Sequence, residues 1–263
     1  MSIIYINPFQ FGLAYDADAQ NYINRVIAAD VAAGNTSGLE VGVQDAINDF
    51  FVDCKADGIW DAIKASCILA GARTLDGALV PLVGAAPTNN FFGDADYDRE
   101  TGLVGDGSTK YLDSNRLDSD DPLDNFHCST YLTTAEPTSN VVMYMGLSGR
   151  LQHGSNATNA FFASKTTGFS NATGSGKPVN FYGQQRSSLT TETARVNGNT
   201  YTVNTTAQVN NANPIFVFKF SQNPTPYHPS ARLAFYSIGE SLDLAALDTR
   251  VSNLITAIGA AIP

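Results

Sequence analysis

The chain has 263 residues, of which 43% are hydrophobic and 15% charged, and it carries a net charge of −10 at pH 7. This length suits one large β domain or two smaller ones. The acidic balance disfavours nucleic acid and anionic membrane surfaces, which attract clustered Lys and Arg, so we predict neither as a partner.

The first segment, Ser2–Phe11, is apolar, has no basic stretch and is interrupted by Pro8. It is too short and too broken for a secretion signal or a membrane span, so we expect synthesis in a cytoplasm and no membrane insertion. An apolar terminal strand needs a partner. It either closes its own sheet or forms an arm that adds to a neighbouring subunit or another protein. The residues that would make such assembly contacts are Ile4, Tyr5, Ile6, Phe9 and Phe11.

Two helices are predicted next. Apolar residues at three- and four-residue spacing predict a helix over Asp16–Ala33. Ser37–Glu40 resembles a capping box that starts a second helix. The apolar face of this second helix holds Leu39, Val43, Ala46, Ile47, Phe50, Phe51 and Cys54. Residues 1–63 are therefore predicted to be an N-terminal arm and helical lead-in, which Trp60 packs against the rest of the chain.

The stretch Asp98–Ser114 predicts two short strands joined by a turn at Gly105-Asp106-Gly107. Far downstream, Arg232–Ser241 is apolar on both faces, which is typical of a central strand. We expect these two distant stretches to meet as neighbouring core strands of one β-sandwich.

Other short strands fill the middle of the chain. They are predicted over Ala65–Ala72, Phe126–Thr134, Asn140–Leu147, Val179–Gln185, Thr191–Val196, Asn199–Thr205 and Pro214–Phe220. The second and third are expected to form a hairpin, and Asn197-Gly198 to join the fifth and sixth in another. This pattern predicts a mainly β fold, a two-sheet antiparallel jelly-roll sandwich over residues 64–241.

Residues 242–263 contain an amphipathic helix predicted over Asp243–Ala260. Its apolar face either packs on its own sandwich or meets copies of itself around a three-fold axis. In the second alternative, Leu247, Val251 and Leu254 are assembly contacts and the protein is a homotrimer.

The stretch Leu117–Asp124 is rich in carboxylates, which are the ligands that Ca²⁺ prefers. Its four aspartates are Asp118, Asp120, Asp121 and Asp124. Their spacing matches no EF-hand, and such clusters between strands are more often plain loops. Calcium is the one cofactor that the sequence suggests, and the loop interpretation is favoured over it.

Motifs for catalysis are missing. The histidines are not at metal-ligand spacing, and the chain has no GxSxG, P-loop or GxGxxG. A strand with the paired carboxylates of a glycosidase is also missing. The three unclustered cysteines predict free buried thiols. We therefore predict that the protein is not an enzyme.

Four phrases of the sequence carry a family resemblance. They are MSIIYINPFQFG, FFVDCKADGIWDAIKASCILAGA, GDGSTKYLDS and ARLAFYSIGESLDLAALDTRVSNLI. Together they resemble the laminin-G-like (concanavalin A-like) jelly-roll modules of tailed-phage virion proteins. The resemblance implies a multi-copy, non-enzymatic structural protein of a tail fibre, baseplate or head decoration. It would be made in the host cytoplasm, be located in the virion and associate with itself and with other virion proteins.

An alternative function is a host-receptor or carbohydrate-binding module at a fibre tip, with a host cell-surface glycan as its partner. Residues 146–206 are rich in Asn, Ser, Thr and Tyr, which hydrogen-bond sugar hydroxyls. In this alternative, Tyr182 and Tyr201 are stacking platforms and Asn199 is a polar contact.

Overall fold

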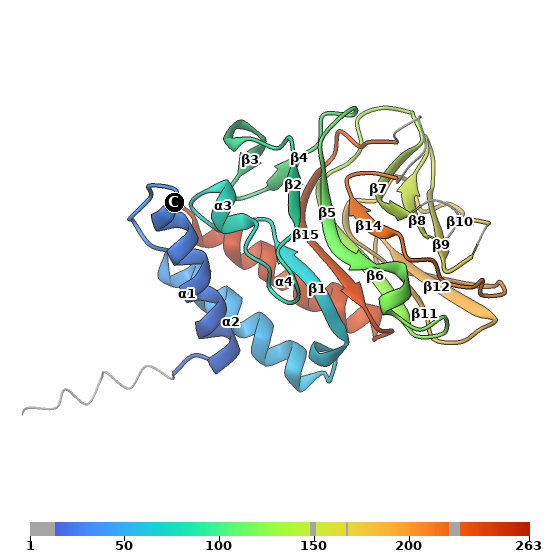
Figure 1. Cartoon of the computed structure of the whole chain (residues 1–263), viewed down its shortest axis with the longest axis horizontal. Coiled ribbons are helices and arrows are strands. Elements are labelled where there is room, and N and C mark those ends of the chain that lie inside the picture. The colour runs from blue at the N-terminus through green and yellow to red at the C-terminus, as the bar shows by residue number, and fades with distance from the viewer. Residues whose placement is uncertain (1–13, 148–150, 167, 221–226) are drawn as a thin grey trace, which may run out of the picture.

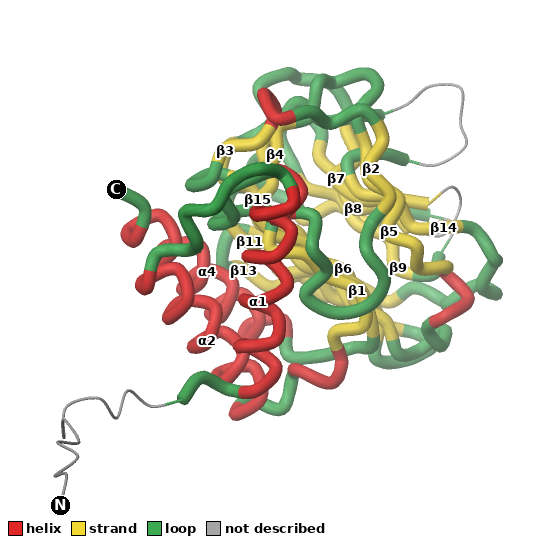
Figure 2. The backbone as a smooth tube through the Cα atoms, turned by 60° about the vertical axis from the view of Figure 1, so that its left-hand side comes forward, coloured by secondary structure: helices red, strands yellow, loops and turns green. Residues whose placement is uncertain are grey.

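A computed structural model gives the structure of residues 14–147, 151–166, 168–220 and 227–263. Two antiparallel sheets pack face to face, and helices cover the outer face of one of them (Figure 1). Figure 2 shows α1 (Ala17–Ala32), α2 (Val41–Ala56) and α4 (Leu244–Ala261) together on one side of the strands. The predicted fold class, a mainly β sandwich with N-terminal helices and a C-terminal helix, is confirmed.

The helix-covered sheet, sheet A, has the strand order β13-β12-β11-β6-β15-β4-β3, and β1 also pairs with β15. Its strands are β1 (Ile63–Ile68), β3 (Tyr97–Asp98), β4 (Gly102–Val104), β6 (Phe126–Thr134), β11 (Asn180–Arg186), β12 (Thr191–Val196), β13 (Asn199–Asn204) and β15 (Arg232–Gly239).

The second sheet, sheet B, has the order β10-β9-β8-β7-β14-β5-β2. Its strands are β2 (Thr88–Asn90), β5 (Tyr111–Leu117), β7 (Val142–Leu147), β8 (Leu151–Ser155), β9 (Ala160–Ser164), β10 (Ser170–Ala172) and β14 (Pro214–Val217). Short helical turns are α3 (Leu75–Ala78), η1 (Trp60–Ala62), η2 (Asp94–Asp96) and η3 (Asp118–Asp120).

The chain has two hydrophobic layers, one on each face of sheet A. Strand β15 contributes to both because its side chains alternate: Phe235 meets the helices, where it packs on Phe50 with ring centroids 5.9 Å apart. The next residue, Tyr236, lies in the layer between the sheets. Because both faces of β15 are buried, the prediction that this stretch is a central strand is confirmed.

Aspartate side chains cap the N-termini of two helices. The carboxylate of Asp16 accepts hydrogen bonds from the backbone of Asp18 and Ala19, and Asp243 caps α4 in the same way. The capping box predicted at Ser37–Glu40 does not form, because the side chain of Glu40 makes no capping hydrogen bond and turns to two arginines instead.

Strand partners differ from prediction in two places. Strand β4 does pair with β15, with Leu103 opposite Leu233, but β5 belongs to sheet B, so Asp98–Ser114 is a crossing between the sheets and not a hairpin. Strands β6 and β7 are likewise in different sheets. The hairpin at Asn197-Gly198 is confirmed, and both turn residues have positive φ, as a type I′ turn requires.

The C-terminal helix covers its own sandwich. Leu247, Val251 and Leu254 are at most 2% exposed within the single chain, so they are not available as contacts at a three-fold axis. Two ion pairs join α4 to α2, from Arg250 to Asp53 and to Asp57. The five predicted contact residues of the N-terminal arm lie outside the described residues.

Candidate functional site

The stacking platform predicted at Tyr182 is wrong. Its side chain is fully buried between the sheets, where its hydroxyl donates to the carbonyl of Phe161 and its ring stacks on His153 at 3.7 Å. Strand β11 lies inside sheet A and both of its faces are covered, which the polar surroundings in the sequence did not indicate. Tyr201 is half-buried against the same core, and Asn199 is exposed beside the hairpin turn, so the buried Tyr182 shares no surface with them.

The aspartate loop is neutralised by cations of the chain itself. Asp118 is buried and pairs with the equally buried Lys165 at 2.8 Å. Asp121 accepts two hydrogen bonds from Arg116, at 2.8 and 2.6 Å. Asp120 caps η3, and Asp124 is exposed. Across the described ranges no three acidic, His or Cys side chains gather as metal ligands would, so the loop interpretation is favoured over a calcium site.

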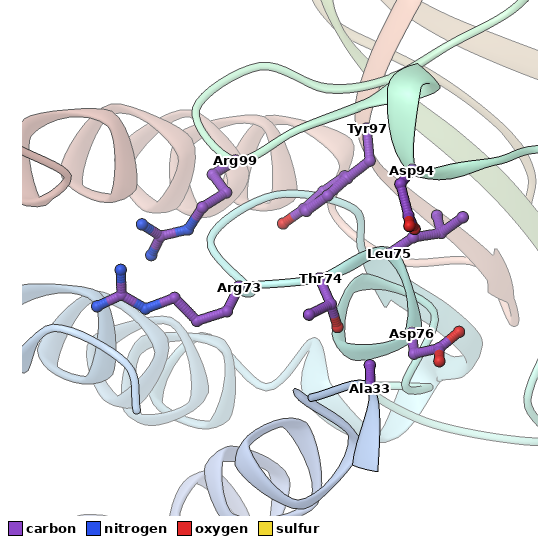
Figure 3. A pocket seen from close by; sticks show the side chains of 8 residues that line it. All are labelled: Ala33, Arg73, Thr74, Leu75, Asp76, Asp94, Tyr97 and Arg99. Atoms are coloured by element: carbon purple, nitrogen blue, oxygen red, sulfur yellow. The ribbon is translucent and has the colours of Figure 1, made fainter. Parts of the chain in front are cut away.

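A polar pocket of about 490 Å³ lies where α1, α3 and β3 meet. Figure 3 shows the guanidinium groups of Arg73 and Arg99 on the opposite side of this pocket from the carboxylates of Asp76 and Asp94. The hydroxyl of Tyr97 is already used, because it donates to the carbonyl of Ala72 at 2.7 Å.

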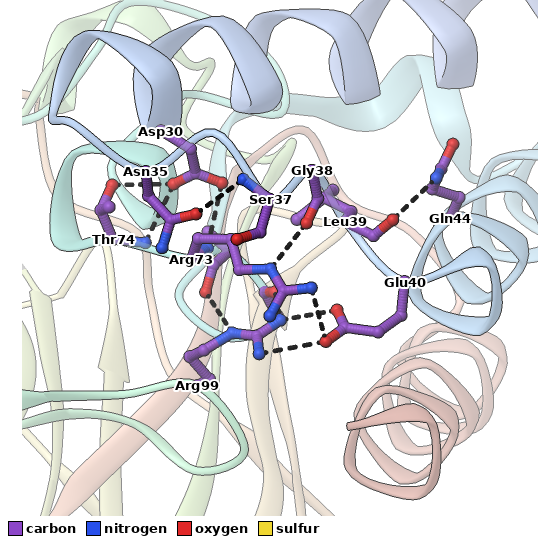
Figure 4. A network of polar contacts seen from close by, with 12 residues as sticks. Asp30, Asn35, Ser37, Gly38, Leu39, Glu40, Gln44, Arg73, Thr74 and Arg99 are labelled. Atoms are coloured by element: carbon purple, nitrogen blue, oxygen red, sulfur yellow. Dashed lines mark hydrogen bonds and ion pairs between the residues drawn. The ribbon is translucent and has the colours of Figure 1, made fainter. Parts of the chain in front are cut away.

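Both arginines of this pocket are occupied by Glu40 (Figure 4). Arg99 donates to both carboxylate oxygens, at 3.2 and 2.7 Å, and Arg73 lies 2.8 Å from one of them. Burial works against ionisation of Glu40, but the hydrogen bond and charge of Arg99 outweigh it, so the pKa of this carboxyl is lowered. The arginines of this pocket therefore form ion pairs with Glu40 that hold the helices against sheet A.

A second concavity, about 460 Å³ in volume, lies on the face of sheet B that points away from sheet A. We call it the aromatic groove, and it is lined by Val141, Met143, Gln152, Asn156, Phe161, Phe169, Phe220 and Tyr227. Strand alternation explains its position: Tyr144 and Phe162 point into the sandwich, so Met143 and Phe161 point outward.

The rings of the groove form two pairs. Phe161 and Phe169 have centroids 5.3 Å apart, and Phe220 and Tyr227 lie 6.1 Å apart at a steep angle. Phe169 is 57% exposed, which is unusual for so large an apolar side chain. Glycine makes room for the floor, because a Cβ at Gly154 would lie 2.9 Å from the ring of Phe161.

Two amide side chains border these rings. Gln152 and Asn156 are half-buried, and both line the groove. The Asn156 carbonyl oxygen accepts hydrogen bonds from the backbone of Thr158 and Asn159, both at 2.9 Å, which fixes the amide and leaves its N–H donors for a ligand. None of the lining residues within the described part of the chain is charged.

Sequence reasoning missed this site because its residues come from three separate segments. They are Val141 and Met143, then Gln152, Asn156, Phe161 and Phe169, and last Phe220 and Tyr227, and only the fold of sheet B brings them to one face. One local signal was present, a lone Phe169 within a run of Gly, Ser, Asn and Thr.

No protein family matches the sequence, and no curated protein is significantly similar to it. Solved structures do resemble the fold. A mutant of Trypanosoma rangeli sialidase with trans-sialidase activity shares 10% identity with a TM-score of 0.46, and the match covers 83% of this chain and 40% of that protein. Trypanosoma rangeli sialidase itself shares 9% identity with a TM-score of 0.42, and the match covers 82% of this chain and 39% of that protein. The chain thus spans about 40% of the length of these proteins.

These neighbours correct one prediction. The sequence favoured a non-enzymatic structural protein of a phage virion, but the matching structures are sialidases, which are enzymes, so that role is not retained. At 9–10% identity the likeness concerns the fold, and the activity of the sialidases is not transferred to this chain. That the protein is not an enzyme stays a prediction from the sequence. Within the described part of the chain, no helix has the length and hydropathy to cross a membrane.

Proposed function

We propose that the protein recognises glycans and that the aromatic groove is the binding site. The observation that carries this proposal is the ring of Phe169, which is 57% exposed beside Phe161 in a groove that also offers amides. A ligand site of this kind joins apolar walls to a few placed polar groups.

The chemistry of a pyranose matches these walls. One face of the sugar ring presents C–H groups, which pack on aromatic rings, and its hydroxyls both donate and accept hydrogen bonds. Gln152 and Asn156 offer amide groups at the side of the groove, and the hydroxyl of Tyr227 is a third polar group. A wholly apolar partner would leave these polar groups without hydrogen bonds, which disfavours it.

The proposal concerns recognition and assigns no cleavage step. A glycosidase needs a carboxylic acid of raised pKa beside the sugar. Burial does raise the pKa of Glu192, but this side chain is fully enclosed, where it accepts hydrogen bonds from Ser164 and Ser170. It does not line the groove.

Binding of the purified protein to an array of neutral, amino and sialylated glycans tests the proposal. We expect saturable binding to at least one glycan and a loss of about tenfold or more in affinity for Phe169→Ala, as for a stacking residue at the centre of a site. The control is Phe91→Ala, because Phe91 is 73% exposed but does not line the groove.

Two outcomes would contradict the proposal. One is an array on which no glycan binds. The other is binding that Phe91→Ala and Phe169→Ala reduce equally, which would mean that exposed phenylalanine, and not the groove, is responsible. Self-association lost in Phe169→Ala, measured by analytical ultracentrifugation, would show that a second copy of the chain occupies the groove.

A further inference from the structure

The aromatic groove adjoins a smaller concavity of about 270 Å³, and the two share the lining residues Val141 and Tyr227. We call this smaller concavity the acidic pocket. It is lined by Asp106, Gly107, Glu136, Thr138, Asn140, Val141, Val142, Tyr227, His228 and Ser230. Its lining is mostly polar, whereas that of the aromatic groove is mostly apolar, so one ligand lying across both would meet two different environments.

Two carboxylates line the acidic pocket. Glu136 is 2% exposed, and its two oxygens accept four hydrogen bonds, from the backbone and hydroxyl of Thr138 and from the backbone of Ser230 and Ala231. All four partners are donors, as an ionised carboxylate requires, because it can only accept hydrogen bonds. Glu136 thus shapes the wall of the pocket and contributes charge, but it has no free oxygen to offer.

Asp106 is the exposed carboxylate of the pocket. One oxygen accepts hydrogen bonds from three backbone N–H groups, of Ser108, Thr109 and Lys110, and the other accepts only the hydroxyl of Thr109. Burial works against ionisation, but these hydrogen bonds lower the pKa of Asp106 well below its ordinary value. The second oxygen retains acceptor capacity toward a ligand.

Among the lining residues of the acidic pocket that the structure describes, none is Lys or Arg. His228 also lines it, and burial lowers the pKa of this ring, which favours its neutral form. Three lysines near the lining residues have other partners. Lys110 pairs with Asp96, Lys177 donates to the carbonyls of Glu136 and Thr138, and Lys219 lies 3.8 Å above the ring of Tyr111.

We propose that the ligand is an oligosaccharide that spans both concavities and places the ammonium group of an amino sugar against Asp106. The inference rests on the proposed function, since it requires a sugar on the rings of the aromatic groove. An acidic sugar would meet two carboxylates and, among the described lining residues, no cation, so sialylated chains bind more weakly than amino-sugar chains of equal length.

The experiment compares glucosamine oligomers with N-acetylglucosamine oligomers of the same length, by calorimetry at a pH that keeps the amine protonated. A charge-assisted hydrogen bond to Asp106 makes the amino oligomer bind about tenfold more tightly. Asp106→Asn removes this preference, while the turn is kept because asparagine retains the oxygen that accepts from its backbone. Added salt weakens the preference in the native protein.

Asp98→Asn is the matched control. Asp98 is exposed and accepts from the backbone of Glu100 and Thr101 in the same kind of turn, but it lines neither concavity. The inference is overturned if both oligomers bind equally, or if Asp98→Asn and Asp106→Asn act alike. In either case, binding that Phe169→Ala abolishes would leave the proposed function standing. If no oligomer binds, the proposed function and the inference both fail.

Discussion

Arg99 donates to both carboxylate oxygens of Glu40, at 3.2 and 2.7 Å, although the two residues are 59 positions apart. Glu40 precedes α2, and Arg99 follows β3, so this contact joins the helical layer to sheet A. The same arginine also donates to the carbonyls of Gly71 and Ala72. The ion pairs of Glu40 with Arg73 and Arg99 thus join three segments of the chain.

Glu40→Gln removes these ion pairs and should destabilise the fold. An amide has one acceptor oxygen where the carboxylate has two, so it cannot accept both hydrogen bonds from Arg99. Arg73 and Arg99 also lose their counter-charge. The side chain of Glu40 is 17% exposed, so solvent compensates only in part. We expect the free energy of unfolding to fall by about 1.5–3 kcal/mol, measured by urea denaturation. Glu100→Gln, at an exposed neighbouring carboxylate, should change it by less than about 0.5 kcal/mol; equal losses would contradict the assignment.

Gly77→Ala should destabilise the fold. A Cβ at this position would stand 2.2 Å from a carboxylate oxygen of Asp30 and 2.9 Å from the Cβ of Ala72. Asp30 cannot retreat without losing its hydrogen bonds from the backbone of Arg73 and Thr74. We expect a loss of about 1–3 kcal/mol in the free energy of unfolding. A substitution that leaves stability unchanged would show that this junction is loosely packed.

Gly259→Ala is the control for that substitution. Gly259 lies in α4, and a Cβ at this position would point into open space, with no neighbouring group within 4 Å. Alanine has the higher helix propensity, so this variant should gain about 0.5–1 kcal/mol. The opposite signs of the two glycine variants separate the effect of close packing from that of backbone freedom.

The helices and the central strand could be predicted from the sequence, because their signals are local. The apolar spacing that predicted Asp16–Ala33 and Asp243–Ala260 agrees within one residue with α1 and α4. The choice of sheet for each strand could not be predicted. Strands β6 and β7 are consecutive and both almost wholly buried, yet they belong to different sheets.

The candidate site was hidden for the same reason. Tyr182 and Phe169 are both aromatic residues in polar surroundings, and the sequence favoured the first. In the fold Tyr182 is enclosed on β11 between the sheets, whereas Phe169 lies on the outer face of sheet B. Exposure depends on which neighbours the sheet supplies, and those neighbours are distant in the chain.

Acid should weaken the fold through two buried histidines. Burial lowers the pKa of His127 to about 4 and that of His153 to about 3, from an ordinary value of 6.5. Below pH 6.5 the unfolded chain therefore binds protons that the folded protein does not. The free energy of unfolding should fall as the pH drops from 6.5 to about 3, and this contribution should level off below that.

The variant His153→Gln isolates this effect from that of the carboxylates. Gln retains hydrogen-bonding capacity toward Thr130 and Gln184, the two partners of the ring, but does not titrate. We expect its urea-denaturation midpoint to depend less steeply on pH than that of the native chain between pH 6.5 and about 3. Identical slopes would mean that His153 is already protonated or becomes hydrated in the folded protein.

Phe169→Trp turns the aromatic groove into its own reporter. Trp60 is the one tryptophan of the sequence and packs on Phe51 beside α2, so it does not sense the groove. An indole at position 169 offers a larger stacking face, and glycan affinity should be kept or raised up to about tenfold. Sugar that covers the ring excludes water, so tryptophan emission should shift to the blue along the same saturation curve as calorimetric binding. Phe91→Trp, at a position that is even more exposed but lies away from the groove, should show no shift. Emission that changes in both variants, or in neither while glycan binds, would place the sugar elsewhere on the protein.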